Sequence, residues 1–428
     1  MRRLAVLLLL AGCRQIFGLE PPARSADAGA DAPIPDGGPC AAASAECVAD
    51  VLRTCSAAGA LPVDTTCTWG CLGPAAHCGA VVPAGGAVTA QDLAPDAILT
   101  DITLNTPSLI IDGDSGAIGT LASPNALRAS GTGVINGIDY AVRGNVAVFR
   151  FASLTAMTTV TPYGSHAIAL VAPGMISVPG TIDMRAPCIN AGALGGSPGG
   201  GAAANGSGAG GGVGAGGGPG GGGGGYGGTG GRGGLNPASG GVTYGNATIT
   251  TLVGGSGGGG GYAAGGAGGG ALQLISGTQI SIAGGINAGG CGGRSSASTA
   301  SGGAGGGAGG TILLEAPTIS ILGKLAVNGG GGGGVGSSSV ASNGTLDRSQ
   351  ASGGSGGIVT GALGAAGATL NGANGAVSTT RGAGGGGSIG RIRIDTRDGT
   401  ATLGAGSVLS PAPTDPGSTC TVATAAVQ

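Results

Sequence analysis

Three stretches of the chain repeat one plan, and this repetition constrains the fold more than any other feature. They are residues 167–186, 271–289 and 311–329. Each begins with an apolar run, passes a turn, continues with alternating apolar positions, reaches a glycine and ends with a third short apolar run. The first two stretches align without a gap and the third needs one, and a weaker fourth copy at 390–403 closes the series.

A unit of three short strands and two turns, about 20 residues long, has the size of one coil of a parallel β-helix or related solenoid. A single coil is too thin to bury its apolar face, whereas stacked coils place each isoleucine row against the rows above and below. Short strand signals also run through residues 80–165, for example at 97–104 and 146–151. We therefore predict an all-β fold with a parallel β-helix or solenoid-like body that carries long glycine-rich insertions. A β-sandwich of similar strands is the alternative.

Glycine tracts separate the copies, and the chain has 105 glycines in 428 residues. The glycines show no strict third-position repeat, which argues against collagen. Two outcomes stay open: flexible loops at one edge of the solenoid, or extended polyproline-II-like runs that pair through their backbone groups. The absence of lysine and glutamate from the tracts favours packing. The tracts are residues 191–241, 254–270, 289–310, 328–337 and 382–387.

The first residues form an export signal. Two arginines follow the initial methionine, and the apolar run from residue 4 to 11 is too short to span a bilayer, which takes about 20 helical residues. The run ends Leu-Ala-Gly before Cys13 and resembles the bacterial lipobox. The resemblance implies cleavage after residue 12 and attachment of lipid to Cys13, which anchors the chain in a membrane. An ordinary secretory signal with an incidental cysteine is the alternative.

Residues 13–39 follow as a lipid anchor and a tether rich in proline, alanine, aspartate and glycine, which cannot bury a core. The residue after the predicted lipidation site is Arg14 and not an aspartate. By analogy with lipoprotein sorting in enteric bacteria, this favours the outer membrane. The sequence therefore predicts a protein held by lipid at the bacterial outer membrane or cell surface.

Residues 40–79 form a small cysteine-rich module. An exported chain meets an oxidising compartment, so we predict three disulfides, although spacing alone does not choose the pairing. A zinc site made by Cys67, Cys71, His77 and Cys78 is the rival interpretation. Beyond the module, Cys188, Cys291 and Cys420 form an odd set, in which two can pair and one stays free. The six module cysteines are Cys40, Cys47, Cys55, Cys67, Cys71 and Cys78.

We predict no catalytic residue, no metal site and no cofactor. Only His77 and His166 could serve a Ser-His-Asp triad, and the Gly-x-Ser-x-Gly motifs around Ser256 and Ser355 lie in glycine tracts instead of on a strand-to-helix elbow. A turn is the interpretation of the Asp-rich segment 112–116, with a lone calcium site as its alternative. Polysaccharide enzymes with a β-helix fold group acidic residues on one face. Four acids lie near the repeats at differing offsets, and we do not expect them to converge: Asp183, Glu315, Asp395 and Asp398.

Read as a whole, the chain resembles the glycine-rich predicted surface lipoproteins of myxobacteria. The residues that carry this resemblance are 13–18 (CRQIFG), 146–154 (VAVFRFASL), 254–261 (GGSGGGGG) and 308–317 (AGGTILLEAP). No assigned activity comes with this family, so the resemblance implies location and architecture only.

These features predict a non-enzymatic cell-surface lipoprotein with a structural, adhesive or extracellular-matrix role, built from residues 80–165 and the glycine-rich repeats of 166–428. Its expected partners are the membrane, through the lipid, and extracellular polysaccharide or other surface proteins. Nucleic acid is not expected, because the net charge is −2 and Lys324 is the single lysine. The alternative is a β-helix enzyme or binding protein that acts on extracellular polysaccharide. A third hypothesis is a flat surface of packed glycine segments, of the kind that ice-binding proteins use.

Overall fold

The computed structural model describes residues 41, 43–58, 61–185, 188, 194–235 and 238–428. The predicted signal (1–12), the predicted tether (13–39) with Cys13 as the predicted lipidation site, and the module cysteine Cys40 lie outside the described residues. The described chain is nearly all β-structure, with one short 3-10 helix, η1 (Ala90–Leu93). None of its described helices has the length and apolar character needed to cross a membrane. Contacts divide the chain into two compact units, residues 1–45 with 53–64 and residues 46–52 with 65–428.

In the described part of the cysteine-rich region the only regular elements are short strands. A three-stranded sheet has the order β1-β2-β3, and β4 pairs with β5 in antiparallel fashion. These strands are β1 (Ser44–Val48), β2 (Val51–Cys55), β3 (Val63–Thr66), β4 (Cys71–Leu72) and β5 (His77–Cys78).

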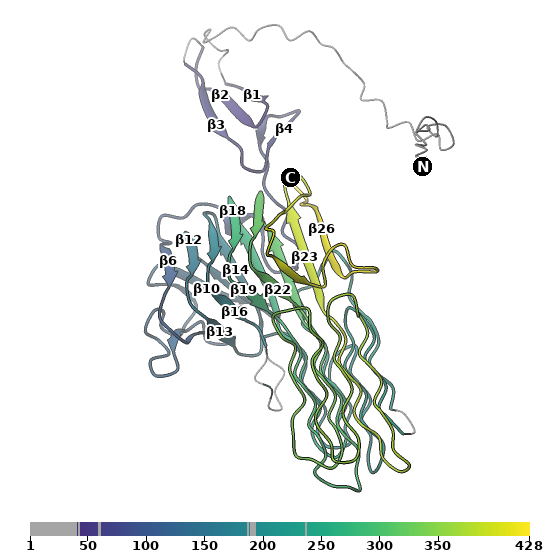
Figure 1. Cartoon of the computed structure of the whole chain (residues 1–428). Helices are drawn as coiled ribbons and strands as arrows, with labels where there is room; N and C mark the ends of the chain where they lie inside the picture. Colours follow the sequence, from purple (N-terminus) through teal and green to yellow (C-terminus); the bar gives the residue numbers. More distant parts are fainter. Residues whose placement is uncertain (1–40, 42, 59–60, 186–187, 189–193, 236–237) are drawn as a thin grey trace, which may run out of the picture. The chain divides into compact units, whose positions relative to one another are not determined.

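The repeat body is built from three open, mostly parallel sheets (Figure 1). The chain visits Sheet 1, then Sheet 2, then Sheet 3 in each copy. Sheet 1 contains β9 (Gly133–Ile135), β10 (Ile138–Arg143), β11 (Val146–Arg150), β14 (Ala167–Ala172), β17 (Ala271–Ser276), β20 (Thr311–Glu315), β23 (Arg391–Thr396) and β26 (Cys420–Thr424). Sheet 2 contains β6 (Asp101–Leu104), β12 (Ser153–Ala156), β15 (Ile176–Val178), β18 (Gln279–Ile282), β21 (Thr318–Ile321) and β24 (Thr402–Leu403). Sheet 3 contains β7 (Leu109–Asp112), β8 (Ile118–Thr120), β13 (Val160–Tyr163), β16 (Thr181–Asp183), β19 (Gly285–Asn287), β22 (Lys324–Ala326) and β25 (Val408–Ser410).

The register of these sheets stacks the sequence copies on one another. In Sheet 1, Ile168 pairs with Leu272, Leu272 with Ile312, and Ile312 with Ile392, so the fourth copy joins the series. Sheets 2 and 3 repeat the pattern between β15 and β18, and between β16 and β19. Successive copies thus pair in parallel, whereas strands joined by tight hairpins would be antiparallel. Among the described strands of the body, antiparallel pairing is confined to β7–β8 and to β9–β10–β11, apart from isolated bridges such as that of Val81 with Val427.

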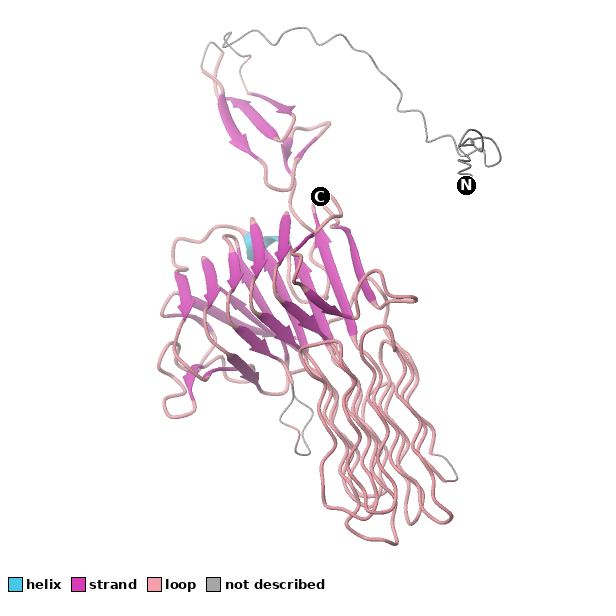
Figure 2. Cartoon of the chain, in the orientation of Figure 1, coloured by secondary structure: helices cyan, strands magenta, loops and turns pink. Residues whose placement is uncertain are grey.

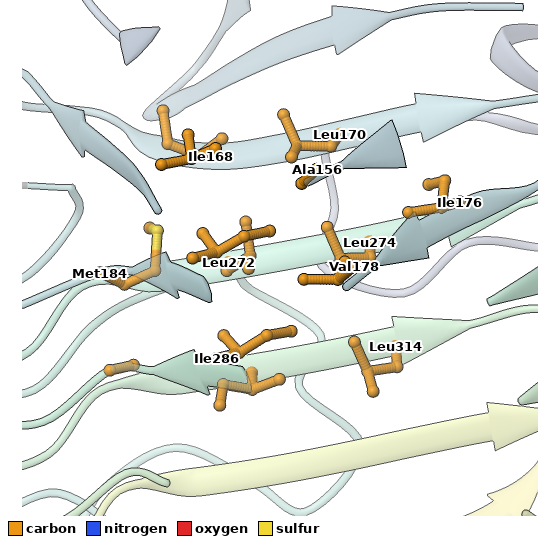
Figure 3. Packing of buried hydrophobic residues seen from close by; sticks show 14 of the residues in the cluster. Ala156, Ile168, Leu170, Ile176, Val178, Met184, Leu272, Leu274, Ile286 and Leu314 are labelled. Atoms are coloured by element: carbon orange, nitrogen blue, oxygen red, sulfur yellow. The ribbon is translucent and has the colours of Figure 1, made fainter. Parts of the chain in front are cut away.

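Apolar rows fill the space between the three sheets (Figure 3). Leu170 and Leu274 follow one another along Sheet 1, and Ile176 and Val178 face them from Sheet 2. Every residue of β14 is buried, on both of its faces. The outer face is covered by residues 79–93, which we call the strap, together with Ile249 and Leu252. Burial on both faces explains why β14 is a continuous apolar run instead of an alternating one.

The glycine tracts extend from one end of the sheets as long, parallel runs without strand assignment (Figure 2). Their hydrogen bonds follow a period of three residues, which is clearest in residues 302–310. Gly303, Gly306 and Gly309 donate their N–H groups to residues 382, 385 and 388. Residues 302, 305 and 308 donate to the carbonyls of residues 217, 259 and 256. Residues 304, 307 and 310 donate to those of residues 294, 291 and 288.

Three residues per turn is the geometry of polyproline II, in which successive residues point in three directions around the axis. Residues 302–310 therefore bond to a different neighbour on each of three sides. A Cβ added at Gly305 would overlap the carbonyl oxygen of Gly222, and one at Gly384 would overlap that of Ala304. Backbones approach this closely only because glycine has no side chain. The described tracts thus confirm packing through backbone groups, and flexible loops are the wrong alternative.

A cluster of aromatic and hydroxyl side chains joins these tracts to the sheets. The hydroxyls of Tyr226 and Thr311 lie 2.7 Å apart, and the rings of Tyr226 and Tyr244 pack with centroids 4.6 Å apart. Arg391, at the start of β23, donates to the carbonyl of Tyr244 at 2.7 Å and lies over the Tyr226 ring. Two of the chain's five tyrosines therefore lie where glycine backbone meets strand.

Candidate functional site

Two of the four acidic residues near the repeats come together. Glu315 at the end of β20 pairs in register with Asp395 on β23, so both carboxyls lie on one face of Sheet 1. The expectation that these acids do not line up is wrong for this pair. Asp183 lies in Sheet 3 and accepts hydrogen bonds from Arg185, and Asp398 caps a turn by accepting from Thr400 N. The shared offset of Glu315 and Asp395, three residues after a core isoleucine, was the available sequence signal.

Both carboxyls of this pair are buried. Glu315 is 1% exposed and accepts hydrogen bonds from Ala84 N at 2.8 Å and from Gln273 Nε2 at 2.6 Å. Burial raises the pKa of Glu315 to about 7, against the opposing effect of those two hydrogen bonds. Burial also raises the pKa of Asp395 to about 6, although Arg393 Nε donates to its carboxylate at 2.6 Å. Adjacent carboxyls with raised pKa values are a pattern that acid–base enzymes use.

The strap contacts Glu315 of this pair. Ala84 contacts Glu315 through its N–H and receives a hydrogen bond from Gln273 Nε2 on its carbonyl at 3.2 Å. The groove beside the strap is lined by residues such as Trp69, Leu93 and Thr278, and neither carboxyl lines it. Both carboxyls are buried and neither lines this groove, so a substrate in the groove would not contact them. Glu315 and Gln273 therefore fasten the strap to Sheet 1.

The strap has a second polar attachment at η1. Asp92 is buried and accepts hydrogen bonds from Arg143 at 2.5 and 2.7 Å, and Arg150 donates to its carbonyl at 3.1 Å. Burial raises the pKa of Asp92, but the hydrogen bonds from Arg143 and Thr89 outweigh burial and hold it below the ordinary value. The strap is thus held at two points, by Glu315 at Ala84 and by Arg143 and Arg150 at Asp92.

His166 takes part in a polar cluster that lacks triad geometry. Its Nδ1 lies 2.8 Å from Asp114 Oδ1, and Ser165 donates to the same oxygen from its N–H and its hydroxyl, both at 2.8 Å. Ser165 Oγ lies 3.4 Å from the same Nδ1. A catalytic triad needs the carboxylate and the nucleophile on opposite ring nitrogens. The cluster ties the turn after β7 to the start of β14.

The remaining candidates are occupied locally. Asp112 Oδ1 accepts from Asp114 N at 2.9 Å, which confirms the turn in 112–116. Ser256 is buried, donates to Tyr244 Oη at 3.0 Å and accepts from Gly210 N at 3.0 Å. The carbonyl of Ser355 accepts a hydrogen bond from Ser339. Among the described residues, no group of three or more His, Cys, Asp or Glu side chains is placed to hold a metal ion.

The cysteines form structural crosslinks. Cys47 is bonded to Cys71 and Cys67 to Cys78, and Cys55 is also disulfide-bonded. The zinc interpretation is therefore wrong, because three of its four ligands are in disulfides. Beyond the module, two cysteines pair and one stays free, as expected: the pair is Cys188–Cys291, and the free thiol is Cys420. Burial raises the pKa of Cys420 to about 12, so this thiol is unreactive at neutral pH.

No protein-family model matches the chain, and no match was found among curated proteins or solved structures. The resemblance to myxobacterial surface lipoproteins therefore remains an expectation that rests on the sequence.

Proposed function

We propose that the chain is a non-enzymatic cell-surface lipoprotein with a structural or adhesive role in the extracellular matrix. The observation that carries the proposal is the packed glycine region, in which backbone meets backbone at positions where a Cβ would overlap a carbonyl oxygen. Such packing makes a stiff projection from tracts that otherwise lose much entropy on ordering. A stiff projection suits a scaffold or an adhesin.

The body of this protein is, in our proposal, a parallel β-helix. The constant order of visits to Sheets 1, 2 and 3 supports this, as does the parallel register of the copies. The glycine-rich insertions leave the body at the end of one coil and return to it at the start of the next, so each coil would carry its own part of the projection.

The location is proposed from the sequence. Cys13 in its lipobox-like setting would carry the lipid, and residues 14–39 would hold the body away from the membrane. We propose the bacterial outer membrane, with display at the cell surface.

Two measurements test the location. Cells expressing the full chain are labelled with radioactive palmitate and then treated with protease from outside. We expect the chain to carry label and to be degraded by the protease, and Cys13→Ser to carry no label. A labelled Cys13→Ser variant would overturn lipidation at this residue, and protection of the labelled chain in intact cells would overturn surface display.

The rival function is a polysaccharide enzyme that uses Glu315 and Asp395, and the raised pKa values of these groups are its support. The mature chain in detergent is incubated with neutral and acidic polysaccharides, and the chain length of each polymer is followed. We expect no shortening, because both carboxyls are buried. Shortening that Glu315→Gln abolishes would replace our proposal with the enzymatic one.

A further inference from the structure

A polar groove runs along the surface of the glycine region. It has a volume of about 420 Å³ and lies between three extended segments, residues 229–234, 239–242 and 371–376. Glycine forms much of its lining, and the side chains in it are those of Thr229, Arg232, Ser239, Val242, Asn371 and Asn374.

Two of these segments present polar side chains with a period of three residues. Residues 229–234 read TGGRGG and residues 371–376 read NGANGA. In a three-fold extended helix, residues three apart lie on one line at a spacing of about 9 Å. Thr229 and Arg232 thus form one row of the groove, and Asn371 and Asn374 form the row opposite.

The two rows are locked together in a regular ladder. Asn371 Oδ1 accepts from Thr229 N at 2.9 Å, and Asn374 Oδ1 accepts from Arg232 N at 2.8 Å. The backbone repeats the pattern, because Gly372 N donates to Thr229 O and Gly375 N donates to Arg232 O. These bonds use the oxygen of each amide and leave its NH₂ group as a donor. Within the described part of the chain, neither these two NH₂ groups nor the Arg232 guanidinium has a hydrogen-bond partner.

The three segments that line the groove carry a single charge, that of Arg232. Residues 186–314 contain Arg232 and Arg294 and no acidic residue, although the whole chain has a net charge of −2. The groove thus offers hydrogen-bond donors and one positive charge, at fixed positions along a line. A ligand that satisfies them carries carboxylates for the guanidinium and hydroxyls for the amides. A glycine segment from a second copy would offer backbone N–H and carbonyl groups but no anion for Arg232.

We propose that this groove binds an acidic polysaccharide, with a sugar carboxylate on Arg232 and sugar hydroxyls on Asn371 and Asn374. The inference rests on the proposed function, because it names the matrix partner of the adhesive role. The regular spacing of the two rows suits a polymer with a repeating unit, and the exposed Val242 side chain offers an apolar wall for a sugar ring.

The test is titration calorimetry on the mature full chain in detergent. The probe is a hexamer of galacturonic acid, and the neutral probe of matched length is maltohexaose. We expect the acidic hexamer to bind, with an affinity that falls as salt rises, and the neutral hexamer to bind at least about tenfold more weakly, as the loss of one charged hydrogen bond implies.

Two variants address the groove directly. Arg232→Gln removes the charge, and Asn374→Asp keeps the oxygen that accepts from Arg232 N while it removes the NH₂ donor and adds a negative charge. Each is expected to weaken binding of the acidic hexamer by about tenfold or more. The matched control is Arg294→Gln, which removes an exposed arginine of the same glycine region outside the groove and is expected to leave the affinity unchanged. Unchanged thermal unfolding shows that each variant is folded.

Three results would overturn the inference. The first is that the acidic hexamer does not bind at low salt. The second is that Arg294→Gln and Arg232→Gln lower its affinity equally. The third is self-association of the chain that Arg232→Gln abolishes, which would identify a second copy as the occupant. If the hexamer neither binds nor is shortened, the groove assignment fails while the non-enzymatic proposal stands. If it is shortened, the proposed function fails as well.

Discussion

At the residue scale, a glycine of the tracts tolerates a methyl group only if no carbonyl oxygen occupies the place of its Cβ. At Gly305 that place is taken by the carbonyl of Gly222, whereas at Gly201 nothing lies within 4 Å. We expect Gly305→Ala to lower the free energy of unfolding by about 3 kcal/mol, because backbone has to shift. Gly201→Ala is the matched control and is expected to change it by less than about 1 kcal/mol. Urea unfolding of both variants measures this, and equal effects would contradict close backbone packing.

The buried carboxyl of Glu315 makes stability depend on pH. Its pKa is raised from 4.5 to about 7 in the folded chain, so the folded state binds a proton more tightly than the unfolded state. Stability is therefore fully present below pH 4.5 and is lost as pH rises through 7, by about 3 kcal/mol for this one group. Asp395, with its pKa raised to about 6, adds a loss of the same sign at lower pH.

We expect Glu315→Gln to flatten most of the fall in stability between pH 5 and pH 7 and to leave the part that belongs to Asp395. Urea midpoints of the parent and the variant across this range provide the measurement. Asp398→Asn is a suitable control, because hydrogen bonds from Thr400 lower the pKa of this exposed carboxyl and keep its titration outside the range. The mechanism is wrong if the parent shows no fall in stability over this interval, or if Glu315→Gln shows the same fall.

At the scale of elements, the copies were predictable and the contacts between tracts were not. Apolar periodicity identified β14, β17 and β20 as equivalent, and the register confirms it. Packing of the tracts depends on pairs such as residues 303 and 382, which are hydrogen-bonded but distant in sequence. Both are glycines, so no side-chain pattern in the sequence predicts that they pair. The pairing of Glu315 with Asp395 was missed for a different reason: all four acids were compared together, and Asp183 and Asp398 do not share the offset of three residues after a core isoleucine that this pair has.

The disulfide between Cys188 and Cys291 joins two elements that are 103 residues apart in sequence. Cys188 follows β16, and Cys291 lies in the tract after β19. Closing so long a loop restricts the unfolded chain, and the loss of the crosslink is expected to cost about 4 kcal/mol. We expect the double variant Cys188→Ala/Cys291→Ala to unfold at lower urea concentration. Cys420→Ala is a control that removes a buried thiol without a crosslink, and an equal effect of the two variants would show that lost packing, not loop closure, is responsible.

At the scale of the whole molecule, the sheets and the glycine region depend on each other. The glycine-rich insertions leave the body after β16, β19 and β22 and return to it at β17, β20 and β23, and the Tyr226 and Arg391 contacts join the two regions. A tract released from the sheets would lose the fixed spacing that its backbone pairing requires, and glycine has the largest entropy to regain on release. The two regions should therefore unfold together.

Hydrogen exchange measures this cooperativity directly. We expect the amides of residues 302–310, all of which donate to backbone carbonyls of neighbouring extended segments, to exchange as slowly as those of β20, because both open only through unfolding of the entire body. The exposed turn at residues 297–300 serves as a fast-exchanging reference in the same molecule. Gly305→Ala should speed exchange in the tract and in β20 by the same factor, since it lowers one shared stability. Rapid exchange of 302–310 beside a protected β20 would mean that the tracts are loose in solution, and the proposed scaffold role would lose its main support.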